Sequence, residues 1–157
     1  MEFRAGSTVL GSAPVTDGTA TFQLPSSTPA GTISVVAHYT GDGRAPPADS
    51  APVTVTIRPA SSAVALLGIP LNLFGLRTGP LLVGFVQLDN GRTARGSLQI
   101  SDNGTVLGTV GLNGGIGLYL VPKAKWTSGT HRYVATFVPA DPANVTGSTS
   151  LPLVLRR

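Results

Sequence analysis

An internal repeat is the feature that most constrains the fold of this chain. Residues 7–12 read STVLGS and residues 104–109 read GTVLGT, and a shift of 97 places residues 3–25 on residues 100–122. One inserted residue then changes the shift to 98, which places residues 30–41 on 128–139 and Val53 on Leu151. The matched positions are turn glycines and apolar residues at every second position, the pattern of β-strands joined by tight turns. The chain is therefore predicted to be a tandem duplication of one β unit.

The two copies differ in length, because residues 61–97 of the second copy have no counterpart in front of Met1. We therefore predict two domains: a partial repeat at residues 1–59, which lacks its first strands, and a complete repeat at residues 60–157. The stretch IRPASS at residues 57–62 joins them. Open sheet edges pair with other chains. Three explanations of the partial copy stay open: an upstream sequence that completes it, a loosely folded unit, or strands supplied by self-pairing or by another protein.

The complete copy is predicted to contain seven strands separated by Gly and Asn-Gly turns, with no helical stripe of 3.6-residue period. This pattern favours a β-sandwich. The strands expected in the complete copy are Ala63–Ile69, Leu81–Leu88, Ala94–Ser101, Thr105–Leu112, Gly117–Pro122, His131–Pro139 and Ser150–Leu155. Those expected in the partial copy are Glu2–Ala5, Thr8–Val15, Thr19–Leu24, Thr32–Thr40 and Pro52–Arg58.

Composition excludes several classes of protein. Charged residues are 11% of the 157, against about 25% in ordinary globular domains, and the net charge of +4 comes from scattered basic residues, so no nucleic-acid partner is expected. There is no cysteine, hence neither a disulfide nor a thiolate metal site. The most apolar stretch, residues 63–76, is too short for membrane insertion. The N-terminal residues MEFRAGS carry no export signal.

Three phrases of the second copy follow one another in a recognisable order: TVLGT at 105–109, SGTHRYVATF at 128–137 and STSLPLVL at 148–155. The first copy carries AGTISVVAHYTGDG at residues 30–43. These phrases resemble the bacterial Ig-like repeats found in tandem on surface and secreted proteins. The resemblance implies an all-β, Ig-like β-sandwich. It also implies a non-enzymatic structural or adhesive module, a spacer or interaction domain, from a larger bacterial cell-surface or secreted protein. Its expected partners are other Ig-like repeats, another protein or a cell-surface glycan.

An alternative function is a carbohydrate-binding accessory domain of a secreted enzyme. Trp126 lies between lysines and a turn in KAKWTSG, and an exposed Trp stacks well on a sugar ring. Tyr133 and Tyr119 are the further candidate contacts. The structural alternative is that Trp126 folds over the edge of the sandwich.

Catalytic and metal sites are not predicted, and no cofactor is expected. His38 and His131 do not recur between the copies and are expected on strand surfaces, and no nucleophile elbow is present. Most of the seven acidic residues fall in turns, where Asp stabilises the backbone. Asp42 and Asp49 are the one candidate loop site, with calcium as the ion considered.

Overall fold

The computed structural model describes residues 1–71 and 78–157, so the end of the apolar stretch at residues 63–76 lies outside the described residues. The described chain is built of strands with one short 3-10 turn at Lys123–Lys125, which confirms the all-β prediction. It divides into two compact units: Met1–Pro59 is called unit 1 below, and Ala60–Arg157 unit 2. No helix among the described residues is long and apolar enough to span a membrane.

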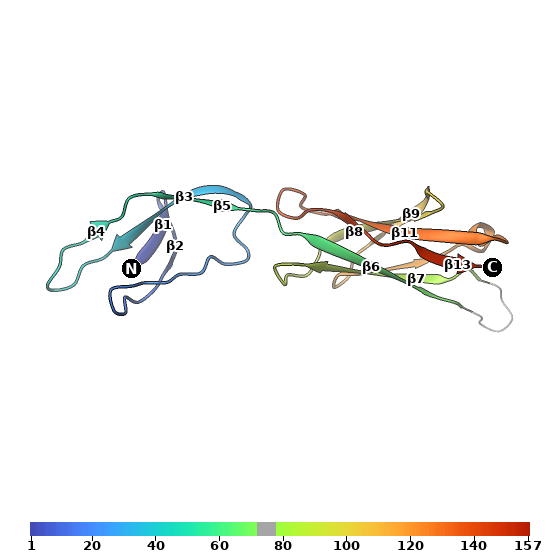
Figure 1. Cartoon of the computed structure of the whole chain (residues 1–157), viewed down its shortest axis with the longest axis horizontal. Coiled ribbons are helices and arrows are strands. Elements are labelled where there is room, and N and C mark those ends of the chain that lie inside the picture. The colour runs from blue at the N-terminus through green and yellow to red at the C-terminus, as the bar shows by residue number, and fades with distance from the viewer. Residues whose placement is uncertain (72–77) are drawn as a thin grey trace. The chain divides into compact units, whose positions relative to one another are not determined.

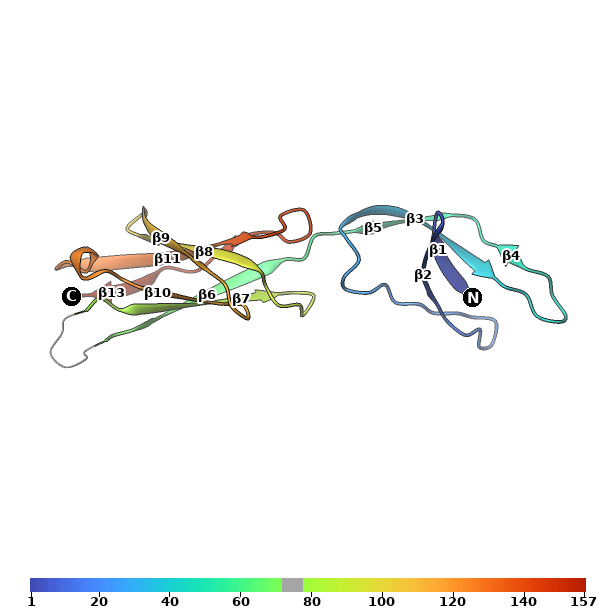
Figure 2. The ribbon, with the colours of Figure 1, turned by 180° about the vertical axis from the view of Figure 1, so that it is seen from behind.

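Unit 2 is a sandwich of two antiparallel sheets (Figures 1 and 2). One sheet has the order β12-β11-β8-β9, with β13 also paired to β11, and the other has the order β10-β7-β6. The strands of the larger sheet are β8 (Gly96–Asp102), β9 (Thr105–Gly111), β11 (Thr130–Pro139), β12 (Ser148–Thr149) and β13 (Leu153–Arg156). Those of the smaller sheet are β6 (Ser62–Ile69), β7 (Leu81–Leu88) and β10 (Ile116–Leu120).

The core of unit 2 lies between these sheets and follows the period-two pattern of the sequence. Alternate residues of β11 point inward, and Tyr133, Ala135 and Phe137 are at most 2% exposed. The buried residues that pack together are Leu82, Val86, Ala94, Leu98, Ile100, Val121, Tyr133, Ala135 and Phe137. Each predicted strand of the complete copy appears within a few residues of its expected bounds.

Only the second half of the last predicted strand, Ser150–Leu155, forms a strand in the structure, as β13, and the short strand β12 lies just before the predicted range. The Ser150 hydroxyl oxygen accepts a hydrogen bond from the Ala135 N–H at 3.0 Å, and the Ser150 N–H donates to the Ala135 carbonyl at 2.8 Å. Pro152 then has no N–H to give to a ladder, so regular pairing resumes only at Leu153.

The first and last parts of unit 2 are tied together directly. Ala60 donates its N–H to the Asn144 carbonyl at 2.9 Å and forms a parallel bridge with Val145. The Ser62 hydroxyl donates to the Thr146 carbonyl at 2.6 Å, and its oxygen lies 2.6 Å from that of Ser148. Strand β6 therefore borders the segment that leads into β12.

Unit 1 is a single antiparallel sheet of order β2-β1-β3-β4, with β5 paired to β3. Its strands are β1 (Glu2–Ala5), β2 (Thr8–Ser12), β3 (Gly31–Tyr39), β4 (Ala48–Asp49) and β5 (Val53–Ile57). They correspond to β8, β9, β11, β12 and β13 of unit 2. Residues 1–59 are all described, and none of them is buried.

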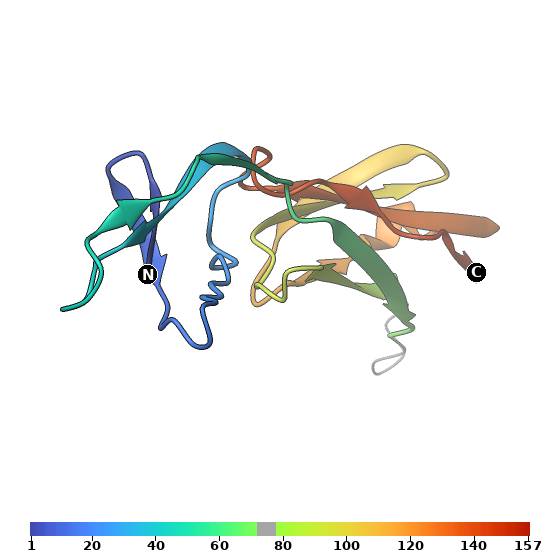
Figure 3. The same cartoon turned by 60° about the vertical axis from the view of Figure 1, so that its left-hand side comes forward.

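The predicted strand Thr19–Leu24 does not form. Its counterpart in unit 2 is β10, which pairs with β7 from Ile116 opposite Phe85 to Leu120 opposite Leu81. Unit 1 contains no counterpart of β7, so the sequence of a strand is present without a strand to pair with. Figure 3 shows this segment as an irregular blue trace beside the sheet.

The structure also corrects the alignment of the two copies near their ends. In unit 1, Ala37 and Ser50 exchange the hydrogen bonds that join Ala135 and Ser150 in unit 2. Ser50 is thus equivalent to Ser150 rather than Ser148, and Val53 to Leu153 rather than Leu151. The shift at this point is 100, because β11 continues for two residues past Phe137, whereas β3 ends at Tyr39, the counterpart of Phe137.

Candidate functional site

A group of polar and aromatic side chains in unit 2 lies where β8 ends and β11 begins. Asp102 is the last residue of β8, and His131 is the second residue of β11. The 3-10 turn Lys123–Lys125 brings Trp126 over the same place, and Tyr133 follows on β11. We call Asp102, Trp126, His131 and Tyr133 the histidine cluster.

His131 is held from both sides of its ring. Nδ1 lies 2.5 Å from the Asp102 carboxylate, and Nε2 lies 2.9 Å from the Thr127 carbonyl. Both partners are hydrogen-bond acceptors, so only the imidazolium, with an N–H on each nitrogen, satisfies both. Burial lowers the pKa of His131, but the bonds to Thr127 and Asp102 outweigh it, and the pKa lies above its ordinary value of 6.5.

Two aromatic rings lie against this imidazolium. The Trp126 ring centroid lies 4.6 Å from that of His131, and the Tyr133 ring is stacked 5.6 Å away at an interplanar angle of 4°. A cation over an aromatic face is stabilised by about 0.5–2 kcal/mol. The Trp126 carbonyl also accepts a hydrogen bond from the Arg157 guanidinium. The cluster therefore joins the 3-10 turn, both neighbouring strands and the last residue of unit 2.

The sequence-based placement of His131 on a strand surface is wrong. His131 is 4% exposed and faces the core, in phase with Tyr133 and Ala135 on the same strand. The two-residue spacing of His131 from Tyr133 could have predicted this burial, since residues two apart on a strand share a face. His38 is different: its ring contacts Asp49, whose side chain is 64% exposed, at 2.6 Å.

The three predicted sugar contacts do not form one exposed platform. Tyr133 is 0% exposed, so its prediction as a ligand contact is wrong. Burial also raises the pKa of its hydroxyl, which has no hydrogen-bond partner among the described residues. Tyr119 is half-buried beside Gly108, and its hydroxyl donates to the Leu107 carbonyl at 3.0 Å. Trp126 is half-buried over His131, which is the structural alternative raised from its sequence.

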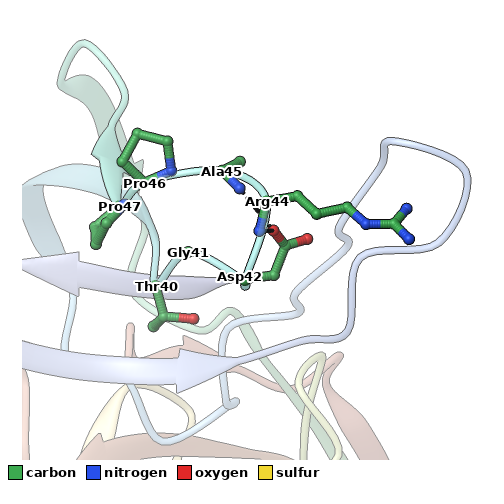
Figure 4. A pocket seen from close by; sticks show the side chains of 8 residues that line it. Thr40, Gly41, Asp42, Arg44, Ala45, Pro46 and Pro47 are labelled. Atoms are coloured by element: carbon green, nitrogen blue, oxygen red, sulfur yellow. Dashed lines mark hydrogen bonds between the residues drawn. The ribbon is translucent and has the colours of Figure 1, made fainter.

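The acidic loop candidate lies in unit 1, where residues Thr40–Pro47 line an open pocket (Figure 4). The Asp42 carboxylate accepts the backbone N–H groups of Arg44 and Ala45, both at 2.8 Å, and these bonds lower its pKa. Asp49 instead contacts His38. Within the described residues no group of three or more His, Cys, Asp or Glu side chains is placed to hold a metal. Calcium binding at Asp42 and Asp49 stays a prediction.

Comparison with known proteins supports the resemblance seen in the sequence. Residues 1–58 match the family model "Bacterial Ig-like domain (group 3)", which confirms the recognition of a bacterial Ig-like repeat for that part of the chain. The fibronectin(III)-like modules of Clostridium thermocellum CbhA are a similar solved structure, with 16% identity and a TM-score of 0.38 over 95% of this chain and 74% of that one. A TM-score this low carries no argument about function. The search of curated proteins gives no match.

Proposed function

We propose that the chain is a non-enzymatic structural module of a larger bacterial cell-surface or secreted protein, in which Ig-like repeats act as a spacer or interaction domain. The observation that carries the proposal is the match of residues 1–58 to bacterial Ig-like domains, together with the duplication that gives unit 2 the same strand order. Modules that are repeated along a chain commonly hold other domains apart.

The course of the chain through unit 2 supports this role. The chain enters at β6 and leaves at β13, and these ends lie at opposite ends of the sandwich (Figure 1). β6 and β13 belong to different sheets, and each is paired along its length to a neighbour within its own sheet. A force applied between the ends must therefore separate the sandwich as a whole.

The roles of the polar candidates also favour a structural module. His131 and Asp102 bind each other and neighbouring backbone, and Tyr119 is tied to Leu107. These contacts stabilise turns and strand ends. Side chains that are engaged in this way support a structural role for unit 2.

The test is single-molecule stretching of the full chain anchored at its two ends. We expect unit 2 to resist and then unfold in one step, with a length gain below the roughly 350 Å that residues 60–157 span when fully extended. Leu82→Ala, which leaves a cavity in the core, should lower the unfolding force, whereas substitution of the exposed Gln87 on the same strand should not. Smooth extension without a step would contradict the role of a rigid spacer.

The carbohydrate-binding alternative now depends on Trp126 and Tyr119, which are both half-buried. A glycan array probed with the full chain and with Trp126→Ala separates the two functions. Binding that is lost in the variant, while unit 2 remains folded, would favour the alternative. The proposed structural role predicts no glycan signal from either protein.

A further inference from the structure

An apolar hollow on one face of the unit 1 sheet is the feature that the proposed function leaves unexplained. Its floor includes the stacked rings of Phe3 and Phe22, whose centroids are 5.2 Å apart. The residues that line it are Phe3, Leu10, Phe22, Leu24, Val35, Ala37, Ser50, Val53 and Val55. Eight of the nine are hydrophobic, and we call this surface the unit 1 hollow.

Every residue of the unit 1 hollow has a counterpart in the interior of unit 2. Phe3, Leu10, Phe22 and Leu24 align with unit 2 at a shift of 97, and Val35 and Ala37 at a shift of 98. Ser50, Val53 and Val55 align at a shift of 100, as the strand pairing requires. The counterparts are Ile100, Leu107, Tyr119, Val121, Tyr133, Ala135, Ser150, Leu153 and Leu155. All of them are either buried or packed against the buried core. The same side-chain positions are thus covered in unit 2 and uncovered in unit 1.

The cover in unit 2 is the hairpin of β6 and β7. Leu82 on β7 is 0% exposed and belongs to the core. On β6, Gly68 lies so close to β13 that a Cβ there would stand 2.9 Å from the Leu153 side chain and 3.1 Å from that of Leu155. These two leucines are the counterparts of Val53 and Val55 in the unit 1 hollow. An alternating apolar hairpin with a glycine at the closest approach is therefore the shape that fits this surface.

The backbone beside the unit 1 hollow also has the turn and the unpaired segment to which such a hairpin could add a strand. The turn before β10 is closed by two bonds between Asn113 and Ile116, and unit 1 has the same pair between Thr16 and Thr19. After that turn β10 pairs with β7, whereas residues 20–24 make no backbone hydrogen bond with the described part of the chain. Unpaired backbone next to an apolar face is a template for strand addition.

We propose that the unit 1 hollow is a docking surface for one occupant, a β-hairpin with the chemistry of β6 and β7, supplied by polypeptide outside residues 1–157. The hairpin covers the hollow with its inward apolar side chains. Its second strand pairs with residues 19–23, as β7 pairs with β10. The result is a second complete Ig-like sandwich.

A second copy of this chain is a poorer occupant. Its own β6 and β7 are already paired with each other over their full lengths and pack against the core of its unit 2, so donating them would open that core. Packing two unit 1 hollows face to face would cover the side chains but would give residues 20–24 no strand to pair with. Only an added hairpin satisfies both the apolar surface and the backbone.

The experiment uses this chain's own hairpin as the probe. Residues 61–97 are fused directly in front of Met1, which is the position that the repeat gives them, and hydrogen exchange is compared with that of the unmodified chain. We expect protection of residues 19–24 and 31–39 to rise by about tenfold or more, with no change in unit 2. A synthetic peptide of residues 61–90, added to the unmodified chain, repeats the test without a covalent link.

Two variants of the added copy serve as matched controls. Leu82→Asp in the added copy places a charge against the hollow and should abolish the gain in protection, whereas Gln87→Asp, on the outward face of the same strand, should retain it. Analytical ultracentrifugation of the unmodified chain gives its oligomeric state. Absence of any gain from both fusion and peptide would overturn the proposal. So would a dimer of the unmodified chain that already protects residues 19–24, because a second copy would then be the occupant. The outcome of this experiment does not depend on the spacer role, because the stretching of unit 2 tests that role separately.

Discussion

Removal of the Asp102 carboxylate should destabilise unit 2 far more than removal of another aspartate in the same local sequence. Asp102 and Asp89 each precede Asn-Gly, in the two DNG turns of unit 2. The Asp102 side chain is 11% exposed and accepts hydrogen bonds from the buried His131 ring and from the Arg132 N–H. Asp89 is exposed and accepts one bond, from the Ser61 N–H at 3.1 Å.

The magnitude follows from what Asp102→Ala leaves behind. The His131 side chain is 5% exposed, so its Nδ1–H would lose its partner without access to water, and the imidazolium would be buried without its carboxylate. Breaking a buried charge pair by removing one partner costs about 3–5 kcal/mol. The Arg132 N–H is near solvent and adds little, because water replaces the lost acceptor. We therefore expect a loss of about 3 kcal/mol for Asp102→Ala, and of about 1 kcal/mol or less for Asp89→Ala.

The assay is urea unfolding followed by tryptophan fluorescence. Trp126 is the only tryptophan of the chain and lies over His131, so its emission reports on unit 2 and on the cluster itself. The free energies of unfolding of the two variants are compared with that of the unmodified chain at pH 6. Equal losses for Asp102→Ala and Asp89→Ala would refute the reasoning, because burial would then contribute nothing to the pair.

Three further predictions concern unit 2. Folding raises the pKa of His131, so the contribution of this residue to the free energy of unfolding should be complete below pH 6.5 and should be lost as the pH rises through the folded pKa. Urea titrations from pH 5 to pH 9 measure this contribution. A contribution that grows with pH would contradict the prediction. Tyr133→Phe removes a buried hydroxyl without a partner, so stability should be unchanged or higher by about 1 kcal/mol, and a clear loss would mean that the hydroxyl is bonded. Gly96→Ala would place a Cβ 2.2 Å from the Val138 carbonyl at a φ of +141°, and should cost about 2 kcal/mol in thermal unfolding, whereas Gly111→Ala, with open space around it, should cost less than about 0.5 kcal/mol.

Strand positions were predictable because the period-two pattern of apolar residues is visible in the sequence itself. The relative register of the two copies was not predictable in the last strand. A slip of two residues keeps every side chain on its face, so Val53 fits Leu151 and Leu153 equally well by pattern. The hydrogen bonds between Ala37 and Ser50 and the pairing of Val53 with Val35 distinguish the two alignments.

Pairing partners and depth of burial account for the remaining errors. The sequence at Thr19–Leu24 has the alternation of a strand, but a strand also needs a neighbour, and alternation does not reveal whether one is present. Tyr133 was named as a candidate sugar contact, although its phase with Ala135 on β11 indicated the core. The pairing of His131 with Asp102 joins two strand ends 29 residues apart, a proximity created by the pairing of β8 with β11, in which Asp102 lies opposite Tyr133.

The bonds that tie Ser62 to Thr146 and Ser148 also set the order in which unit 2 can be made during synthesis. They join residues 84 and 86 positions apart, so the last strands must leave the ribosome before the first can complete its contacts. At about 5–20 residues per second, that interval is roughly 4–17 s. Throughout it, the sheet that covers the apolar side of the β6 and β7 hairpin is incomplete, because its last strands have not left the ribosome. Export or chaperone capture within those seconds would therefore act on a hairpin whose covering sheet is not yet complete.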